Sequence, residues 1–396
     1  MSTSPTGSAG EHQSDERPDE RQARTERLRH VRAALASAEA DAILVQNPKD
    51  IRYLTGCSGH DCLLLLSGSG LVLISDPRYD EQLDPWRGGE TEVLIGTRHR
   101  LPEAVAQACR ERAITSLGLQ AENVTLLGHQ QLKAALEGVR LVELAGLIAP
   151  FRMRKDVLEV ARIERGVQIQ QAALEAALTE LALGKTEREF CARIEYEMKI
   201  RGAEKASFDP IVATGANSSR IHHETGATPI GEGTLLIDWG AVVEGYSSDM
   251  TRTFFVGETP GKMREIYAVV LEAQLAAIEA CRPGRTCAEI DAVARKVITE
   301  AGYGQRFGHG LGHGLGMDTH EGPYFNHLET DVVLESGMVM TVEPGIYLPG
   351  IGGVRIEDDV VITESGCRVL GDWPKDNEAM RLEVPGRSMG VAGERL

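Results

Sequence analysis

The sequence predicts an α+β protein of two domains, in which an α/β domain precedes a larger domain built from two related α-β-β halves. The first observation is length, because 396 residues exceed what one typical domain holds. The second is that helical and strand patterns alternate up to about residue 146. The third is a duplication in the later part of the chain. We expect residues 26–149 to form the first domain and residues 150–396 the second.

The composition is that of an ordinary globular protein with an acidic excess. Apolar residues make up 42% of the chain and the net charge is -17. An acidic surface disfavours nucleic acids and anionic membranes as partners. Neither an apolar run long enough to span a bilayer nor a secretory signal is present, so we expect a cytoplasmic protein. Seven scattered cysteines without a Cys-x-x-Cys pair indicate reduced thiols.

The amino-terminal part predicts a tail followed by alternating elements. Residues 1–25 contain almost no large apolar side chain and cannot offset the entropy of ordering, so we expect disorder there. From Arg27 the pattern indicates an amphipathic helix, and strands follow at residues 41–46, 62–67 and 71–75. This alternation predicts an α/β domain.

The later part contains two segments with a shared pattern. Residues 184–195 read Gly-Lys-Thr-Glu-Arg-Glu-Phe-Cys-Ala-Arg-Ile-Glu, and residues 284–295 read Gly-Arg-Thr-Cys-Ala-Glu-Ile-Asp-Ala-Val-Ala-Arg. Each segment predicts a helix that ends at a glycine, Gly202 or Gly302. Such a repeat indicates two copies of one unit, and we expect a pseudo-twofold axis to relate them.

Four acidic residues occupy matching places in the two copies. Asp238 and Glu343 each end an apolar strand pattern just before a glycine turn, and Asp249 and Glu357 lie in the strand pattern after that turn. A carboxylate that ends a buried strand is costly unless a cation neutralises it. Four such carboxylates, brought together between the two halves, predict a site for divalent cations.

A glycine-rich run at residues 307–323 adds three histidines, His309, His313 and His320. Glycine lets the backbone approach a bound group closely, and so much glycine disfavours a helix. A loop with surface imidazoles would show the same composition. Combined with the four acids, however, the run indicates the floor of a site, and one imidazole with four carboxylates suits two divalent ions.

The motifs together resemble those of the M24 metallopeptidases, whose catalytic domain has the pita-bread fold. They are Ile-Asp-Trp-Gly, Ser-Asp-Met-Thr-Arg-Thr, Gly-His-Gly-Leu-Gly-Met-Asp-Thr-His-Glu, Val-Glu-Pro-Gly and Gly-Val-Arg-Ile-Glu-Asp. Two earlier motifs, Asp50-Ile-Arg-Tyr-Leu-Thr-Gly and Asp76-Pro-Arg-Tyr, are similar to the amino-terminal domain of the creatinase, prolidase and aminopeptidase P branch. The resemblance covers about residues 26–370. It implies a pita-bread catalytic domain preceded by a creatinase-type α/β domain.

The resemblance also implies the ligands and the cofactor. The metal ligands would be Asp238, Asp249, His313, Glu343 and Glu357. Hard oxygen donors with one imidazole suit two divalent ions, with manganese preferred and cobalt, zinc or iron as alternatives.

Three further histidines, His222, His309 and His320, match family positions that contact the substrate or the tetrahedral intermediate. Arg355 matches a site arginine. Many relatives have a proline before the first of these histidines, where this chain has Ile221 followed by His222 and His223. The choice between His222 and His223 therefore stays open.

The implied reaction is hydrolysis of an Xaa-Pro bond at the amino terminus of a peptide or in a dipeptide. Two divalent ions lower the pKa of water and so supply hydroxide near neutral pH. Glu343 would accept a proton and pass it to the leaving nitrogen, and His320 would stabilise the oxyanion. The partners implied are small peptides with proline at the second position, and the family leads us to expect a homodimer.

Other functions stay open. One is a creatinase-like hydrolase that cleaves a carbon–nitrogen bond without metal, although its relatives have substitutions at the metal positions and this chain has none. Another is a non-catalytic protein that binds a partner through the same fold, which the intact ligand set disfavours. Methionine aminopeptidase fits less well, because its usual short form lacks the first domain. Aminopeptidase P and prolidase are not distinguished.

Overall fold

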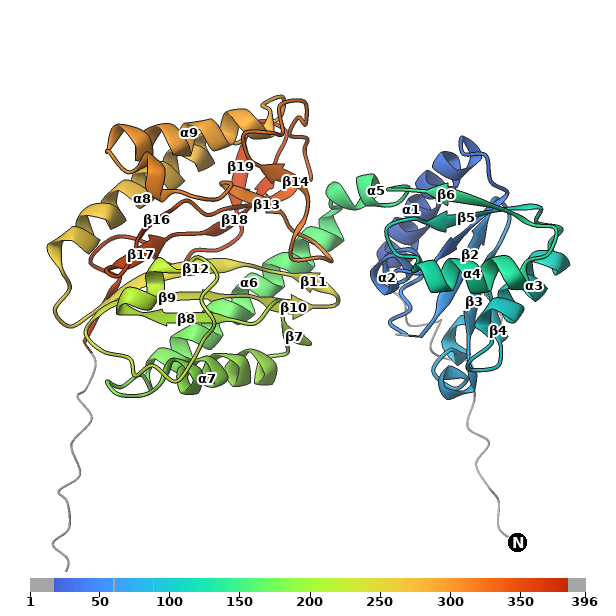
Figure 1. Cartoon of the computed structure of the whole chain (residues 1–396), viewed down its shortest axis with the longest axis horizontal. Helices are drawn as coiled ribbons and strands as arrows, with labels where there is room; N and C mark the ends of the chain where they lie inside the picture. Colours follow the sequence, from blue (N-terminus) through green and yellow to red (C-terminus); the bar gives the residue numbers. More distant parts are fainter. Residues whose placement is uncertain (1–17, 60, 88, 384–396) are drawn as a thin grey trace, which may run out of the picture. The chain divides into compact units, whose positions relative to one another are not determined.

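The computed structural model describes residues 18–59, 61–87 and 89–383. The chain divides into two compact units, Met1–Arg152 and Met153–Leu396 (Figure 1). Among the helices that the structure describes, none combines the length and the apolar character that crossing a membrane requires.

The first unit is built on one mixed sheet. Its strands are β1 (Ala42–Val45), β2 (Leu63–Ser67), β3 (Leu71–Ser75), β4 (Thr91–Ile95), β5 (Ser116–Gln120) and β6 (Arg140–Leu144). They lie in the order β4-β3-β2-β1-β5-β6, with β1–β5, β5–β6 and β3–β4 parallel and the other pairs antiparallel. The strands β1, β3 and β5 are buried along their whole length, as expected for a sheet with both faces covered. The predicted α/β architecture is confirmed.

The first helix of this unit begins earlier than the composition predicts. They are α1 (Pro18–Ala36), α2 (Pro48–Thr55), α3 (Leu101–Glu111), α4 (Leu126–Ala135) and α5 (Ala149–Met153). Residues 18–25 are therefore helical, which corrects the disorder expected for residues 1–25, and residues 1–17 lie outside the described residues. Asp19 and Glu20 stabilise this first turn, because acidic side chains complement the positive end of a helix.

The second unit contains two pairs of helices that repeat one another. They are α6 (Val157–Leu178), α7 (Glu187–Ile200), α8 (Gly261–Ala280) and α9 (Cys287–Glu300). Thr186 and Glu189 form a capping box at the start of α7, and Thr286 and Glu289 form the same box at the start of α9. In Figure 1, α6 and α7 lie on one side of the strands of this unit, and α8 and α9 lie on the other.

Four sheets lie between these helix pairs. Their strands are β7 (Lys205–Ala206), β8 (Ile211–Thr214), β9 (Gly233–Trp239), β10 (Ala241–Val243), β11 (Tyr246–Ser247), β12 (Met250–Val256), β13 (Gly312–Gly314), β14 (Glu321–Phe325), β15 (Val339–Val342), β16 (Gly345–Leu348), β17 (Gly352–Arg355), β18 (Asp358–Ile362), β19 (Cys367–Val369) and β20 (Arg381–Leu382). The strand orders are β11-β10-β7, β20-β12-β9-β8, β14-β13-β15-β18-β19 and β16-β17. The first helix pair precedes β9 and β12, and the second pair precedes β15 and β18, so the duplicated α-β-β order is confirmed.

In both copies the acids lie where a strand begins or ends, or where the chain passes from one sheet to another. Asp238 lies near the end of β9, and Asp249 directly precedes β12. Glu343 lies between β15 and β16, which belong to different sheets. Glu357 was expected within a strand, but it lies between β17 and β18, again at a change of sheet. Where the chain leaves one sheet, a side chain can turn into the space between sheets.

Candidate metal centre

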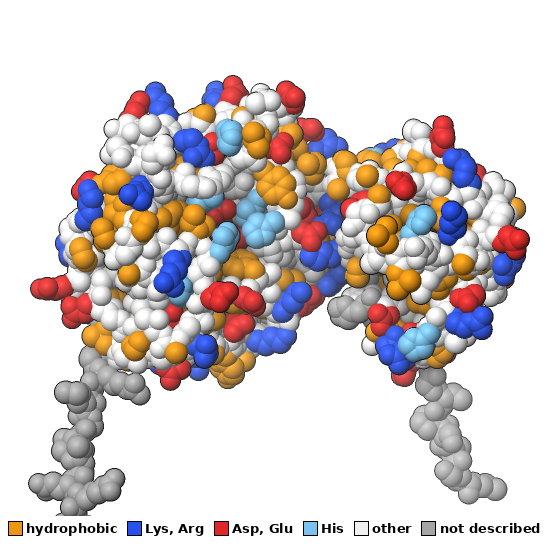
Figure 2. Space-filling view, viewed as in Figure 1, with side chains coloured by type: hydrophobic (Ala, Val, Ile, Leu, Met, Phe, Trp, Pro, Cys, Tyr) orange, Lys and Arg blue, Asp and Glu red, His pale blue; other side chains and the backbone are white. Residues whose placement is uncertain are grey.

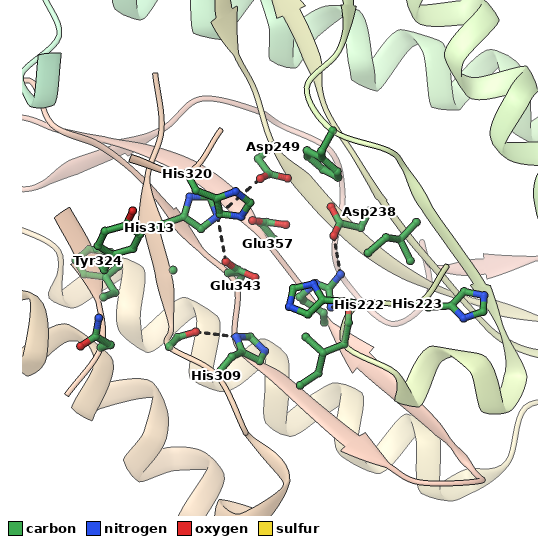
Figure 3. A pocket seen from close by; sticks show the side chains of 18 of the residues that line it. His222, His223, Asp238, Asp249, His309, His313, His320, Tyr324, Glu343 and Glu357 are labelled. Carbon is green, nitrogen blue, oxygen red and sulfur yellow. Dashed lines mark hydrogen bonds and ion pairs between the residues drawn. The ribbon is translucent and has the colours of Figure 1, made fainter. Parts of the chain in front are cut away.

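The nine predicted site residues all line one cleft of about 490 Å³ in the second unit. They are His222, Asp238, Asp249, His309, His313, His320, Glu343, Arg355 and Glu357. In Figure 2 histidine side chains gather in a hollow on the face of this unit, and Figure 3 shows the side chains from β9, β13 and the strand breaks directed toward one another. The cleft therefore joins residues from both copies of the duplication.

Three of these residues form the tightest group. Ligand atoms of Asp249, His313 and Glu357 all lie within 4.8 Å of one another, and all three side chains are buried. Glu343 lies close by, with its Oε1 3.4 Å from His313 Nε2. Buried carboxylates and an imidazole at this spacing can hold a divalent cation.

The ring of His313 is oriented for metal binding. Its Nδ1 lies 3.1 Å from the carbonyl oxygen of Gly314, which can only accept, so Nδ1 carries the proton. Burial lowers the pKa of His313 to about 3, so the ring is neutral. The unprotonated Nε2 faces Asp249 and Glu343. A second hydrogen bond that fixes the tautomer in this way is typical of metal-ligating histidines.

The carboxylates repel one another in the absence of a cation. Burial and the neighbouring carboxylates raise the pKa values of Asp249 and Glu357 well above their ordinary range. Burial raises the pKa of Glu343 to about 8. The Oδ1 atoms of Asp238 and Asp249 are buried, and no described residue donates a hydrogen bond to them. Oxygens without a donor and with this excess of negative charge fit a bound cation.

Asp238 differs from the other acids because it already has a cationic partner. Arg355 Nη2 donates to Asp238 Oδ2 at 2.6 Å, which leaves Oδ1 as the atom that can bind a metal. Arg355 Nε also donates to Thr251 Oγ1, and that hydroxyl donates to Glu357 Oε2 at 2.6 Å. The arginine thus connects the first copy of the duplication to Glu357 in the second.

Buried residues behind the acids hold their backbone in place. Arg252 Nη1 donates to the carbonyl oxygen of Glu357, and Nη2 forms an ion pair with Asp358 at 2.6 Å. Asp359 Oδ2 accepts from the backbone N–H of Asp249 at 3.0 Å. These contacts join β12 to the segment around Glu357, so the two halves of the site are fixed by hydrogen bonds as well as by packing.

His309 lies in a network that the sequence did not indicate. Its Nδ1 lies 2.7 Å from the carbonyl oxygen of Gly310, so Nε2 is the acceptor and the hydroxyl of Tyr347 donates to it at 2.9 Å. That hydroxyl accepts in turn from Arg355 Nη1. Burial lowers the pKa of His309 to about 4 and raises that of Tyr347 to about 12, so both groups are neutral. Any donation from His309 to a substrate requires the contact with Tyr347 to change.

Tyr347 could have been found from strand alternation. It lies two residues after Gly345, and residues two apart share a face. Gly345 pairs with Arg355 across the β16–β17 hairpin, and a side chain on Gly345 would overlap the hydroxyl of Tyr347. The pattern Gly-Ile-Tyr after the strand break could therefore have indicated that Tyr347 lies near Arg355.

The remaining histidines differ in exposure. His222 is exposed and its ring points into the cleft, whereas His223 is buried and lies apart from the other labelled side chains (Figure 3). His223 Nε2 lies 2.9 Å from Glu187 Oε2. His320 is also exposed, and its ring centroid lies 4.2 Å from that of His313. Burial lowers the pKa of His320, and it remains accessible from the cleft.

Comparisons with known proteins agree with this geometry. Residues 161–364 match metallopeptidase family M24, and residues 27–154 match the creatinase/prolidase N-terminal domain. An Xaa-Pro dipeptidase of Pyrococcus horikoshii is 35% identical over 349 residues, which cover 87% of this chain and 96% of that protein.

Solved structures show the same relationship. A structure titled Xaa-Pro dipeptidase from Bacillus anthracis has a TM-score of 0.86 and 37% identity, covering 91% of this chain and 100% of that one. The X-Pro aminopeptidase from Thermotoga maritima has a TM-score of 0.81 and 33% identity, covering 87% of this chain and 99% of that one. The resemblance seen in the motifs is confirmed, and the chain belongs to metallopeptidase family M24, with a creatinase-type α/β domain before the pita-bread domain.

Proposed function

We propose that this protein is a dinuclear-metal-dependent exopeptidase that hydrolyses the Xaa-Pro bond at the amino terminus of peptides or in dipeptides. The observation that carries the proposal is the buried group of Asp249, His313 and Glu357, whose ligand atoms lie within 4.8 Å of one another. The names of the relatives, Xaa-Pro dipeptidase and X-Pro aminopeptidase, support the substrate class. Peptides with proline at the second position are the proposed substrates.

Five residues are proposed to hold two divalent ions, with manganese preferred. They are Asp238, Asp249, His313, Glu343 and Glu357. Bound cations of this type polarise a carbonyl group and lower the pKa of water. Four carboxylates balance the charge of two such ions, and these cations would offset the repulsion that raises the pKa values of Asp249 and Glu357.

Glu343 is the proposed proton carrier. It is half-buried, and its Oε1 lies 3.4 Å from His313 Nε2 within the proposed metal site, where a carboxylate can accept a proton from water and return it. In this role it takes a proton from the attacking water and gives it to the proline nitrogen as the bond breaks. An amide nitrogen leaves as a neutral amine only when it gains a proton, so this delivery accompanies cleavage of the carbon–nitrogen bond.

The other polar side chains are proposed to place the substrate. His320 and His222 are exposed to the cleft and can donate to the carbonyl oxygen as it becomes negative. The half-buried ring of His309 offers a neutral wall for the proline ring. Arg355 holds Asp238 in place, and Asp238 or its metal would anchor the free α-amine.

The test is turnover of Ala-Pro and of Ala-Pro-Ala by the purified protein after chelation and after reloading with Mn²⁺. We expect no turnover in the chelated protein and turnover after reloading. Cleavage of Ala-Pro alone indicates a dipeptidase, and cleavage of Ala-Pro-Ala indicates an aminopeptidase. Full activity after rigorous chelation would contradict the proposal and favour a metal-free carbon–nitrogen hydrolase.

Metal analysis of the dialysed protein addresses the non-catalytic alternative. A protein that binds metal but cleaves neither peptide would support a binding function on this fold. Sedimentation of the purified chain tests the expected homodimer separately, since no described contact depends on it.

A further inference from the structure

The loop that carries His222 is closed onto one buried carboxylate. It leaves β8 at Thr214, passes through the short 3-10 helix Gly215–Ser219 and continues to Gly226. Glu187, the first residue of α7, lies beneath it with its side chain fully buried. A loop of this length without strand pairing needs such an anchor to hold one conformation.

Both oxygens of Glu187 are used. Oε1 accepts from the backbone N–H of Thr214 and from Asn217 Nδ2, each at 2.9 Å. Oε2 accepts from His223 Nε2 at 2.9 Å and from the backbone N–H of Gly226 at 3.2 Å. Four donors therefore come from the start, middle and end of the loop, and His222 lies inside the closed segment.

The charge state of the pair follows from these contacts. Burial acts to raise the pKa of Glu187, but the donors of Asn217, Thr214 and His223 outweigh it and hold that pKa below its ordinary value. The carboxylate is thus ionised and can only accept, so His223 Nε2 carries the proton. His223 Nδ1 is buried and has no partner among the described residues.

The second copy of the duplication shows that Glu187 is not needed to start the helix. Both helices keep the capping box, Thr186 with Glu189 and Thr286 with Glu289. At the position of Glu187 the second copy has Cys287. The carboxylate is thus present in the copy that carries His222 and absent from the copy that carries His309, His313 and His320.

We propose that Glu187 and His223 form a buried clamp that positions His222 for the reaction. The carbonyl oxygen of Ile221 lies 3.5 Å from Arg355 Nη1, so the chain is held on both sides of His222. No described residue hydrogen-bonds to the His222 ring itself, which leaves that ring available to the substrate. Glu187 and His223 are positioning residues, because Glu187 does not line the cleft and His223, which lies at its wall, has its Nε2 on Glu187. The inference rests on the proposed function.

The test compares four variants loaded with Mn²⁺ and assayed on Ala-Pro and Ala-Pro-Ala. In Glu187→Gln one carboxylate oxygen becomes an NH2 group, which faces two of the loop's donors and cannot accept from them. In His223→Leu the donor to Oε2 is lost. A displacement of about 1 Å at a reacting group can cost about 100-fold in rate. We therefore expect kcat to fall about 10- to 100-fold in both variants, with unchanged bound manganese and a smaller change in KM.

Two variants serve as controls. His223→Gln supplies a donor near the position of Nε2, so it should retain more of kcat than His223→Leu. Glu197→Gln removes a buried carboxylate on the same helix that pairs with Arg193 and Arg201 and does not line the cleft. It should lower thermal stability and leave kcat unchanged. Equal loss of kcat in Glu197→Gln would show a general effect of weakening α7, against the proposal.

A double-mutant cycle with His222→Ala separates positioning from an independent role. If the clamp acts through His222, adding Glu187→Gln to His222→Ala lowers kcat by less than about twofold. If the double variant instead loses kcat by the product of the two single losses, or if Glu187→Gln keeps the wild-type kcat, the inference is overturned.

Hydrogen exchange of residues 214–226 gives a readout that does not depend on activity. The amides of Thr214 and Gly226 should exchange faster in Glu187→Gln and in His223→Leu than in wild type, but not in Glu197→Gln. If the wild-type protein cleaves neither peptide, the proposed function fails, and unchanged exchange would then reject the clamp as well. Faster exchange in an inactive protein would show that the clamp holds the loop but serves no such reaction.

Discussion

The histidines around the cleft are distinguished by what their two ring nitrogens contact. In His313 the Nδ1 proton goes to a backbone carbonyl and Nε2 is left for a cation, and in His309 both nitrogens are occupied. His222 and His320 are exposed to the cleft. The sequence could name these histidines but could not separate their roles, because the roles depend on partners such as Gly310 and Tyr347 brought close by folding.

Replacement of His320 by alanine should lower kcat about 100- to 1000-fold, the usual effect of removing a donor to an oxyanion. Bound manganese should stay close to the wild-type amount, because His320 is not in the group that lies within ligand distance. The measurement is kcat on Ala-Pro or Ala-Pro-Ala, together with metal analysis. His99→Ala in the first unit is the matched control and should change neither quantity.

A loss of manganese in parallel with kcat, with the rate per bound metal unchanged, would contradict this role. His320 would then act on the site through its ring contact with His313.

At the scale of elements, the cleft depends on strands that stop or change sheet beside each acid. β15 ends just before Glu343, and β17 ends two residues before Glu357, so each acid lies in a break between two paired strands. Close packing also matters, because β13 carries His313 between two glycines. The sequence indicated the glycine-rich floor, but not which neighbour requires each glycine.

Gly312→Ala tests this packing. A methyl group there would overlap the carbonyl oxygen of Thr341 on β15, and backbone in a paired strand cannot move aside easily. We expect a loss of about 1–3 kcal/mol in the free energy of unfolding and weaker manganese binding through His313. Thermal melting and metal titration measure the two effects. Gly231→Ala is the control, because nothing lies within 4 Å of the added atom.

Unchanged manganese affinity in Gly312→Ala, together with a normal melting temperature, would show that β13 can shift without disturbing His313. The floor of the cleft would then be less rigid than its contacts indicate.

At the scale of the whole molecule, the duplication made much of the site predictable. Asp238 and Asp249 come from one copy, and Glu343 and Glu357 from the other, so matching positions could be recognised in the chain itself. Glu187 could not, since its function depends on donors that lie far along the chain, as at Gly226. The start of α1 was also missed, because polar helical residues have the composition of a tail.

Bringing these acids together makes the stability of the metal-free protein depend on pH. The pKa of Glu343 rises from 4.5 to about 8 on folding, so between these values the folded state holds a proton that the unfolded state has lost. Below about pH 6.5 the lowered pKa values of His309 and His313 act in the opposite direction, so the free energy of unfolding should fall as pH rises from about 6.5 to about 8, by up to about 1.4 kcal/mol per pH unit for each carboxyl group whose pKa is raised. Urea unfolding with a chelator present measures this slope.

Manganese should flatten this dependence, since the cations replace the protons that the carboxylates share. Unfolding at the same pH values in excess Mn²⁺ is the comparison. A chelated protein whose stability rises steadily over this interval would contradict the pKa directions of Asp249, Glu343 and Glu357.

The division of ligands between the two copies has a further consequence for symmetry. Of the proposed ligands, the first copy supplies two oxygen donors, Asp238 and Asp249, and the second supplies Glu343, Glu357 and the imidazole of His313. Neither set alone could enclose two metal ions. A shorter ancestor with a single copy would have had to meet a twin across a twofold axis to do so. Because both copies now belong to one chain, their sequences can differ, and the imidazole can come from the second copy alone.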